Sequence, residues 1–331
     1  MRLLILTILG LALATCARAA ADPRFAAAAD LSRKSGGIAM LVMIEGKIVF
    51  EDYPNGGAAT RATELASGTK SFSGVLALCA VEDGWLKLDE KVSDTLTEWR
   101  DDTARRDITV RQLLTLTSGI PGGESALRTG RVPTYAEAAA VKAVTARGKT
   151  FSYGPNPFQV FGELLRRKLA PRGETVWQYL SQRILQPLGL ESMRWRGSAL
   201  GQPQLPSGAG LSARDWAKFG EAIRLDGKGI LPPGRLAQCF SGTTVNLGYG
   251  LTWWLPGKGP SGVIPRRIRG PWLPEETWLA AGAGGQRLVV VPSLNLVAVR
   301  LAPVRGEAEN PFNDGAWLRA LLEPLAAGTA K

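Results

Sequence analysis

The sequence predicts an α+β protein with two lobes, built on one antiparallel sheet that combines strands from both ends of the chain. Short apolar segments rich in β-branched residues occur near both ends, whereas the segment between them has the helical spacing of apolar residues. The economical arrangement pairs both sets of strands in one sheet flanked by helices, and sets the middle apart as a mainly helical lobe. We expect a single domain over residues 22–331, with a sheet lobe from about 35–84 and 246–331 and a helical lobe from about 85–245.

Residues 1–21 have the pattern of a secretory signal peptide, which predicts a periplasmic or secreted protein. Arg2 precedes an apolar run, and Ala17-Arg18-Ala19 provides a small-x-small cleavage site. The apolar run is too short for a membrane-spanning helix, so no transmembrane span is expected. A lipid anchor at Cys16 is the less favoured alternative, because the preceding threonine fits a lipoprotein signal poorly.

The elements that follow are expected in this order. Residues 38–53 read as a hairpin around a Glu45-Gly46 turn, and an apolar helix runs from Ser67 to about residue 82. Threonine and serine caps mark helices that begin at residues 109 and 212, and further helices are expected at 135–144, 158–169 and 175–185. Strands are expected at residues 249–255, 277–281, 286–291 and 294–301, before a closing helix at 316–325.

The composition excludes several kinds of site. The 331 residues carry a formal charge of +11 and include no histidine, so a Ser-His-Asp triad, a Cys-His dyad or a histidine-ligated metal is impossible. The cysteines are too dispersed for a metal cluster, although a Cys79–Cys239 disulfide stays open. Lys and Arg form short clusters, such as 166–168 and 266–269, and not the long stripe that nucleic acid requires, so no nucleic-acid partner is expected.

Ser67-Gly68-Thr69-Lys70 is the main candidate for chemistry. A serine and a lysine three residues apart lie on one face of a helix, so the amine can reach the hydroxyl. Without histidine, a serine nucleophile needs a lysine or tyrosine as its base, and a lysine desolvated here would have a lowered pKa. The bland alternative is a helix cap followed by an exposed lysine.

Two further segments are candidate partners. Tyr153 lies in a Gly-Pro loop before an apolar helix, where its phenol could relay a proton, or could simply pack against its own loop. The small residues at 280–286 allow close approach of a ligand, and an amide there could join that of Ser67 in an oxyanion hole. An ordinary glycine-rich turn between strands explains the same pattern.

In this order and spacing, the three segments resemble the serine beta-lactamase and penicillin-binding-protein superfamily. The resemblance is closest to the branch related to class C beta-lactamases, and it covers about residues 35–302 through the segments "ELASGTKSFSGVLALCAVEDGWLKLDEKVSDTL", "ITVRQLLTLTSGIPGG", "LSARDWAKFGEAI" and "GYGLTWW". It implies an acyl-enzyme mechanism with Ser67 as nucleophile and with Lys70 and Tyr153 sharing the acid–base work. It also implies the two-lobed fold and no metal or organic cofactor.

Two departures from that family concern substrate recognition. The second family motif is usually Tyr-x-Asn, but here Asn156 comes one position late after Tyr153. The third is usually Lys- or His-Thr/Ser-Gly, but here it is Ala280-Ala281-Gly282, so the cation and hydroxyl that hold a beta-lactam carboxylate are missing. Arg287 or the 266–269 cluster could replace that cation.

These observations predict an exported serine hydrolase that cleaves an ester or amide of a small molecule or peptide through an acyl-Ser67 intermediate. The predicted site comprises Ser67, Lys70 and Tyr153 as catalytic residues, with Gly282, Ala283 and Asn156 as oxyanion or substrate-binding residues. Two alternatives stay open: a beta-lactamase or D,D-carboxypeptidase, and a non-catalytic binding protein of the same fold.

Overall fold

A computed structural model describes residues 22–123, 131–191, 193–259, 268, 270–304 and 312–326. The predicted signal peptide, including Cys16, and three of the four residues of the 266–269 cluster lie outside the described residues. Within the described part of the chain, no helix is long and apolar enough to cross a membrane.

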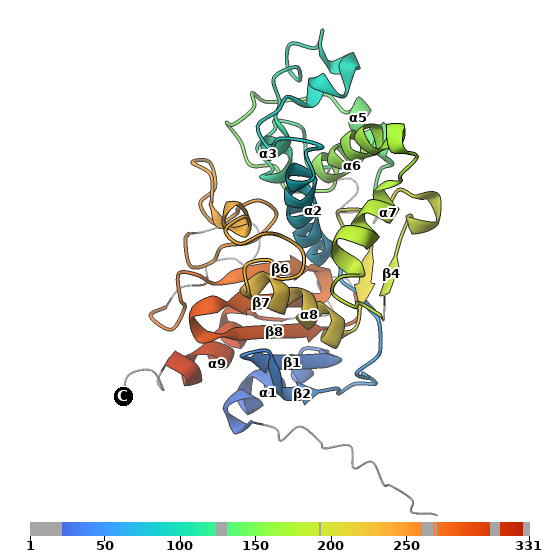
Figure 1. Ribbon diagram of the computed structural model, residues 1–331. Coiled ribbons are helices and arrows are strands. Elements are labelled where there is room, and N and C mark those ends of the chain that lie inside the picture. The colour runs from blue at the N-terminus through green and yellow to red at the C-terminus, as the bar shows by residue number, and fades with distance from the viewer. Residues whose placement is uncertain are drawn as a thin grey trace, which may run out of the picture.

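The main sheet has five antiparallel strands in the order β2-β1-β8-β7-β6, so the two N-terminal strands form one edge and pair with the three C-terminal strands through β1 and β8 (Figure 1). Its strands are β1 (Ala39–Ile44), β2 (Lys47–Asp52), β6 (Trp278–Gly282), β7 (Gln286–Val291) and β8 (Leu296–Leu301). The predicted N-terminal hairpin is confirmed: β1 and β2 are joined at Glu45 and Gly46, both with positive φ, as a two-residue hairpin turn requires. The predicted combination of N- and C-terminal strands in one antiparallel sheet is therefore correct.

Helices cover both faces of this sheet. Helix α8 (Ala213–Arg224) packs on β7 and β8, where a Cβ on Gly220 would lie 2.7 Å from side-chain atoms of Leu288 and Val297. Helices α1 (Ala26–Lys34) and α9 (Asp314–Ala326) contact one another. They lie on the opposite face of the sheet. Arg287 and Arg300 point to that face, where they donate to Asp314 on α9 and to the carbonyl of Ser35, the C-cap of α1.

The mainly helical lobe is built around α2 (Lys70–Glu82), which runs from the sheet into that lobe (Figure 1). All but two of its residues are buried, as expected for a helix that is apolar on every side. Around it lie the helices α3 (Val110–Leu114), α5 (Tyr135–Ala140), α6 (Asn156–Leu169) and α7 (Val176–Leu180). The remaining helical turns are η1 (Pro23–Phe25), η2 (Ala66–Thr69), η3 (Val92–Asp94), η4 (Thr97–Trp99), η5 (Ala170–Arg172), the π-helical η6 (Ser181–Leu185), η7 (Ser198–Leu200), η8 (Leu236–Phe240), η9 (Ala283–Gly285) and η10 (Pro292–Leu294).

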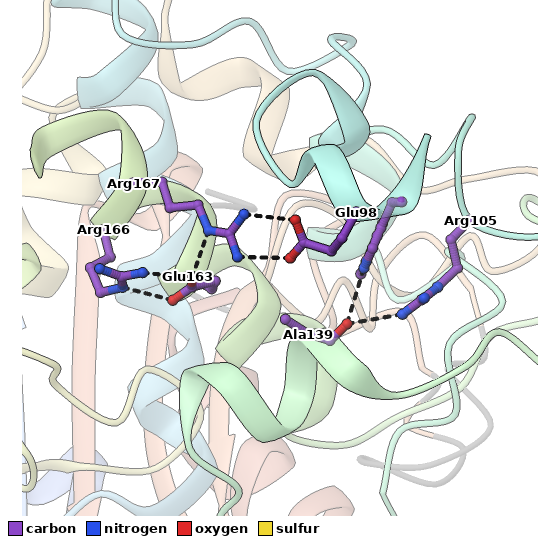
Figure 2. A network of polar contacts seen from close by, with 7 residues as sticks. Glu98, Arg105, Ala139, Glu163, Arg166 and Arg167 are labelled. Carbon is purple, nitrogen blue, oxygen red and sulfur yellow. Dashed lines mark hydrogen bonds and ion pairs between the residues drawn. The ribbon is translucent and has the colours of Figure 1, made fainter. Parts of the chain in front are cut away.

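The basic cluster at residues 166–168 is paired with carboxylates, so it forms no free cationic stripe. Glu163 accepts hydrogen bonds from Arg166 and Arg167, and Arg167 also binds Glu98 of η4 in a bidentate pair (Figure 2). The third basic residue, Lys168, lies 2.8 Å from Glu90. These ion pairs tie α6 to η4 and leave little positive charge to attract a polyanion.

Two parts of the fold differ from the prediction. Residues 249–255 form a tight turn, not a strand: only Trp254 bridges to the sheet, through Leu279, and Thr252 has a φ of 71°. A second, three-stranded sheet that the sequence did not predict joins β3 (Thr63–Glu64), β5 (Ala209–Leu211) and β4 (Met193–Trp195). The open question of a disulfide is answered in this structure, in which Cys79 and Cys239 are both free and buried.

Candidate active site

Ser67 lies in η2, a single 3-10 turn that is held from several sides. Ala66 before it has a φ of 46°, an unfavourable conformation for alanine. The Thr69 hydroxyl donates a hydrogen bond to the Ala66 carbonyl at 2.7 Å and accepts one from the Ala209 amide at 3.1 Å. These bonds fix the turn, and Ser67 itself stays partly exposed.

Lys70 begins α2 and its side chain returns to the serine. Its Nζ lies 2.9 Å from Ser67 Oγ and donates a hydrogen bond to the Pro206 carbonyl at 3.0 Å. The residue is only 3% exposed, and burial lowers the pKa of its amine from 10.5 to about 7. Part of the Lys70 population is therefore neutral near pH 7 and able to accept the Ser67 proton.

Tyr153 lies beside this pair. Its ring centroid is 4.9 Å from Lys70 Nζ, within cation–π range, and 5.2 Å from the Trp254 ring. Burial raises the pKa of the Tyr153 phenol to about 12, while a side-chain hydrogen bond with Ser67 and the charge of Arg287 act in the opposite direction. The phenol therefore stays protonated at neutral pH and can act as an acid toward a group at Ser67.

The loop that carries Tyr153 is clamped to the preceding loop through Gly122. The Gly122 amide donates to Ser152 Oγ at 2.8 Å, and its carbonyl accepts from the Asn156 amide at 3.1 Å. A Cβ on Gly122 would lie 2.1 Å from the Tyr153 carbonyl oxygen, so only glycine allows this approach.

The glycine-rich turn between β6 and β7 lies against the Ser67 turn. A Cβ on Gly282 would lie 2.0 Å from the Leu65 carbonyl oxygen and 3.0 Å from the Gly68 nitrogen. Ala283 follows directly, as the first residue of η9. Segments more than 200 positions apart in the sequence thus meet at the Ser67 turn, and Ala283 is the residue that follows the contact.

The two other predicted residues have local partners. Asn156 Nδ2 donates to the Pro121 carbonyl at 3.0 Å, and a Cβ on Gly123 would lie 2.9 Å from Asn156 Oδ1. The side-chain amide of Asn156 thus faces the 121–123 loop. Arg287, the possible replacement for the missing cation, is 4% exposed and binds Asp314 on α9, so it is not free to hold a substrate carboxylate.

Several residues near Ser67 and Tyr153 were not predicted as site residues from the sequence. Pro206 contributes only a backbone carbonyl, and Trp216 contributes only a ring edge, 2.8 Å from where a Cβ on Gly68 would lie. The tight turn at 249–254 places Tyr249 and Trp254 beside Tyr153, with ring centroids 6.5 and 5.2 Å away. The GYGLTWW segment was the available signal for these aromatic residues, but it reads equally well as a strand.

The arrangement is suited to nucleophilic chemistry. A serine hydroxyl, a lysine that is partly neutral at pH 7 and a protonated phenol lie together, with backbone amides nearby. Among the described residues, no group of carboxylate or cysteine side chains could hold a metal ion.

The comparisons with known proteins agree on one fold family. The family model Beta-lactamase matches residues 17–322. A comparison with curated protein sequences found no match. Three of the similar solved structures share 18% to 19% identity with the chain, so their likeness concerns the fold.

A protein from Bacteroides dorei DSM 17855 named as a beta-lactamase has a TM-score of 0.73 at 18% identity, over 92% of this chain and 98% of that one. A protein from Bacillus anthracis named as a 6-aminohexanoate-dimer hydrolase has a TM-score of 0.69 at 19% identity, over 91% and 81%. EstCE1, a hydrolase with promiscuous acyltransferase activity, has a TM-score of 0.66 at 18% identity, over 92% and 99%. Because the family model spans nearly the whole sequence, the chain belongs to the beta-lactamase family.

Proposed function

We propose that this protein is an exported serine hydrolase that cleaves an ester or amide bond through a covalent acyl-Ser67 intermediate. Members of the beta-lactamase family are serine hydrolases, and the similar structures include proteins named as hydrolases. The proposed export rests on the signal-peptide pattern of residues 1–21.

One observation carries the proposal: Lys70 Nζ lies 2.9 Å from Ser67 Oγ, and its pKa is about 7. In the proposed reaction, the Ser67 oxygen attacks the carbonyl carbon while its proton passes to Lys70. The carbonyl oxygen becomes an oxyanion between the Ser67 and Ala283 amides. The tetrahedral intermediate collapses as Tyr153 gives its proton to the leaving group and takes up the proton that Lys70 had received. A water molecule then attacks the acyl-enzyme, which releases the acid and returns a proton to Ser67 Oγ.

Ester or amide hydrolysis is favoured over efficient beta-lactam hydrolysis. The motif that usually supplies a cation for the beta-lactam carboxylate reads Ala280-Ala281-Gly282 here. Arg287 does not replace that cation, because its guanidinium is bound to Asp314 and to backbone carbonyls. The printed names of the similar structures include both kinds of activity, so they do not separate the two.

The test compares the wild type and Ser67→Ala on a p-nitrophenyl ester and on a cephalosporin. We expect ester turnover in the wild type, none in Ser67→Ala, and the same thermal melting for both. Fast cephalosporin turnover would instead favour a beta-lactamase or D,D-carboxypeptidase. Equal ester turnover by the two proteins would overturn the assignment of Ser67, and no turnover by the wild type would favour the binding protein.

A further inference from the structure

Two buried arginines hold the carbonyl groups of the glycine-rich turn beside Ser67. Arg287 Nη1 donates to the Gly282 carbonyl at 2.9 Å. Arg300 Nη1 donates to the carbonyls of Gly284 and Gly285, at 3.2 and 2.7 Å. The two arginines are opposite one another on β7 and β8, on the face of the sheet that α1 and α9 cover.

The geometry of the peptide bond gives the first of these contacts a consequence at the active site. In a planar trans peptide, the C=O of one residue and the N–H of the next point in opposite directions. The bond from Arg287 to the Gly282 carbonyl therefore fixes the Ala283 N–H on the side away from Arg287. Gly282 itself lies against Leu65 and Gly68, on either side of Ser67, so the peptide bond between Gly282 and Ala283 begins at the turn that carries the nucleophile.

We propose that Arg287 is a positioning residue that orients and polarises the Ala283 amide for the oxyanion of the acyl-transfer step. The inference rests on the proposed function, because it gives that amide its role. A cation bound to the carbonyl of a peptide draws electron density from its N–H and makes it a stronger donor. Arg300 holds the far end of the same turn.

Burying two arginines side by side is energetically unfavourable, which supports a role for them beyond packing. Arg287 and Arg300 are like charges opposite one another in the sheet, and they are 4% and 0% exposed. The described residues supply one carboxylate for the two of them, Asp314, which binds Arg287 in a bidentate pair. The Phe312 ring lies 3.9 Å from the Arg300 guanidinium, and burial lowers the pKa of Arg300 to about 9. An apolar pair would fill this space without that desolvation, but could not hold the turn carbonyls.

The same charge also reaches the catalytic residues. Arg287 lowers the pKa of the Tyr153 phenol against the larger effect of burial. A positive charge behind the turn therefore stabilises negative charge at both the phenol and the oxyanion position.

The experiment uses Arg287→Lys, with Arg105→Lys as the matched control. Lysine keeps the charge but cannot bind Asp314 in a bidentate way and also reach the Gly282 carbonyl. Arg105 is likewise buried, binds Asp102 and donates to the Ala139 carbonyl, but it lies in the helical lobe (Figure 2). We expect Arg287→Lys to lower kcat for a p-nitrophenyl ester about 10- to 100-fold, with KM within about threefold of the wild type. Arg105→Lys should leave both constants within about twofold.

Ala283→Pro tests whether Arg287 acts through the Ala283 N–H, because proline has no N–H. Gly282, with φ of −131° and ψ of 161°, has the extended backbone that precedes proline readily, and Ala283 is the first residue of η9. We expect Ala283→Pro to lower kcat about 100- to 1,000-fold. Adding Arg287→Lys to Ala283→Pro should cost less than about a further twofold, since the oriented donor is already gone.

A second readout is inhibition by phenylboronic acid, which forms a tetrahedral, negatively charged adduct with a serine. Its affinity should fall in Arg287→Lys by the same factor as kcat/KM, because both depend on the oxyanion. Two results would contradict the role of Arg287. One is an unchanged kcat in Arg287→Lys. The other is that Arg287→Lys lowers kcat in the Ala283→Pro background by the same factor as in the wild type. If Arg287→Lys does not fold, Asp314→Asn is used in its place, because it releases the Arg287 guanidinium. We expect Asp314→Asn to lower kcat by a smaller factor, and an unchanged kcat in this variant would also contradict the role of Arg287. Ser67→Ala, measured in parallel, tests the proposed function separately.

Discussion

Replacing Lys70 with methionine should abolish turnover and, at the same time, make the protein more stable. Burial lowers the Lys70 pKa from 10.5 to about 7, so the folded state disfavours the charged form of this amine. At about 1.4 kcal/mol for each pH unit, that difference corresponds to about 5 kcal/mol of lost stability. Methionine has a similar length and no charge to desolvate.

The gain is partly offset by the hydrogen bonds that Lys70 makes. Its amine contacts Ser67 Oγ and the Pro206 carbonyl, and each such bond contributes about 1 kcal/mol net. We therefore expect Lys70→Met to raise the free energy of unfolding by about 3 kcal/mol at pH 7.

The dependence on pH gives this prediction its signature. A lysine whose folded pKa is depressed destabilises the fold fully below about pH 7, and the penalty disappears as the pH rises toward 10.5. Between these values the unfolded chain binds more protons, so wild-type stability rises with pH. The advantage of Lys70→Met should therefore shrink between pH 7 and pH 10.

Urea unfolding followed by tryptophan fluorescence, at pH 7 and pH 10, measures both effects. Lys228→Met, at an exposed lysine, is the control and should show no such pH-dependent gain. If Lys70→Met is no more stable than the wild type at pH 7, Lys70 is not held as a desolvated amine and the argument for its role as base is wrong.

Three further predictions concern the same site. The kcat/KM of the wild type should rise with pH through a midpoint of about 7, because only the neutral Lys70 amine accepts a proton. It should stay high to pH 10, because the Tyr153 pKa is about 12. A flat profile in a stopped-flow or plate assay from pH 5 to 10 would argue against Lys70 as the base. Tyr153→Phe should lower kcat about 100- to 10,000-fold without unfolding the protein, since it removes the phenol and keeps the ring; Tyr53→Phe, whose hydroxyl binds Glu51, is the control and should match the wild type. Gly282→Ala places a Cβ 2.0 Å from the Leu65 carbonyl oxygen, so it should lower the free energy of unfolding in urea by about 1–3 kcal/mol and also lower kcat. The control Gly315→Ala in α9 should change neither. Equal stability of Gly282→Ala and the wild type would contradict the close contact of the two turns.

Features that depend on local sequence were predictable. The β1–β2 hairpin follows from alternating apolar residues around Glu45-Gly46, and α8 begins at its cap Ser212, whose Oγ accepts from the Asp215 amide at 3.1 Å. The proximity of Ser67 and Lys70 follows from their three-residue spacing, which η2 and α2 preserve.

Features that depend on tertiary contacts were not. Residues 249–255 have the composition of a strand, but in the fold they turn and pack against Gly74 of α2. The Gly74 amide donates to the Thr252 hydroxyl at 3.2 Å, and a Cβ on Gly74 would lie 2.5 Å from the Leu251 carbonyl oxygen. The short strands β3, β4 and β5 have two or three residues each, too few to show an alternating pattern. The contact of Lys70 with Pro206 uses a backbone carbonyl, which any residue at that position would offer.

The central claim is that Ser67 forms a covalent bond during the reaction, and intact-mass spectrometry tests it most directly. The wild type is incubated with a fluorophosphonate, and a peptide map then locates the adduct. We expect one adduct on Ser67, which is absent from Ser67→Ala and forms more slowly in Lys70→Met. A wild type that stays unmodified, or that carries its adduct on another residue, would contradict it.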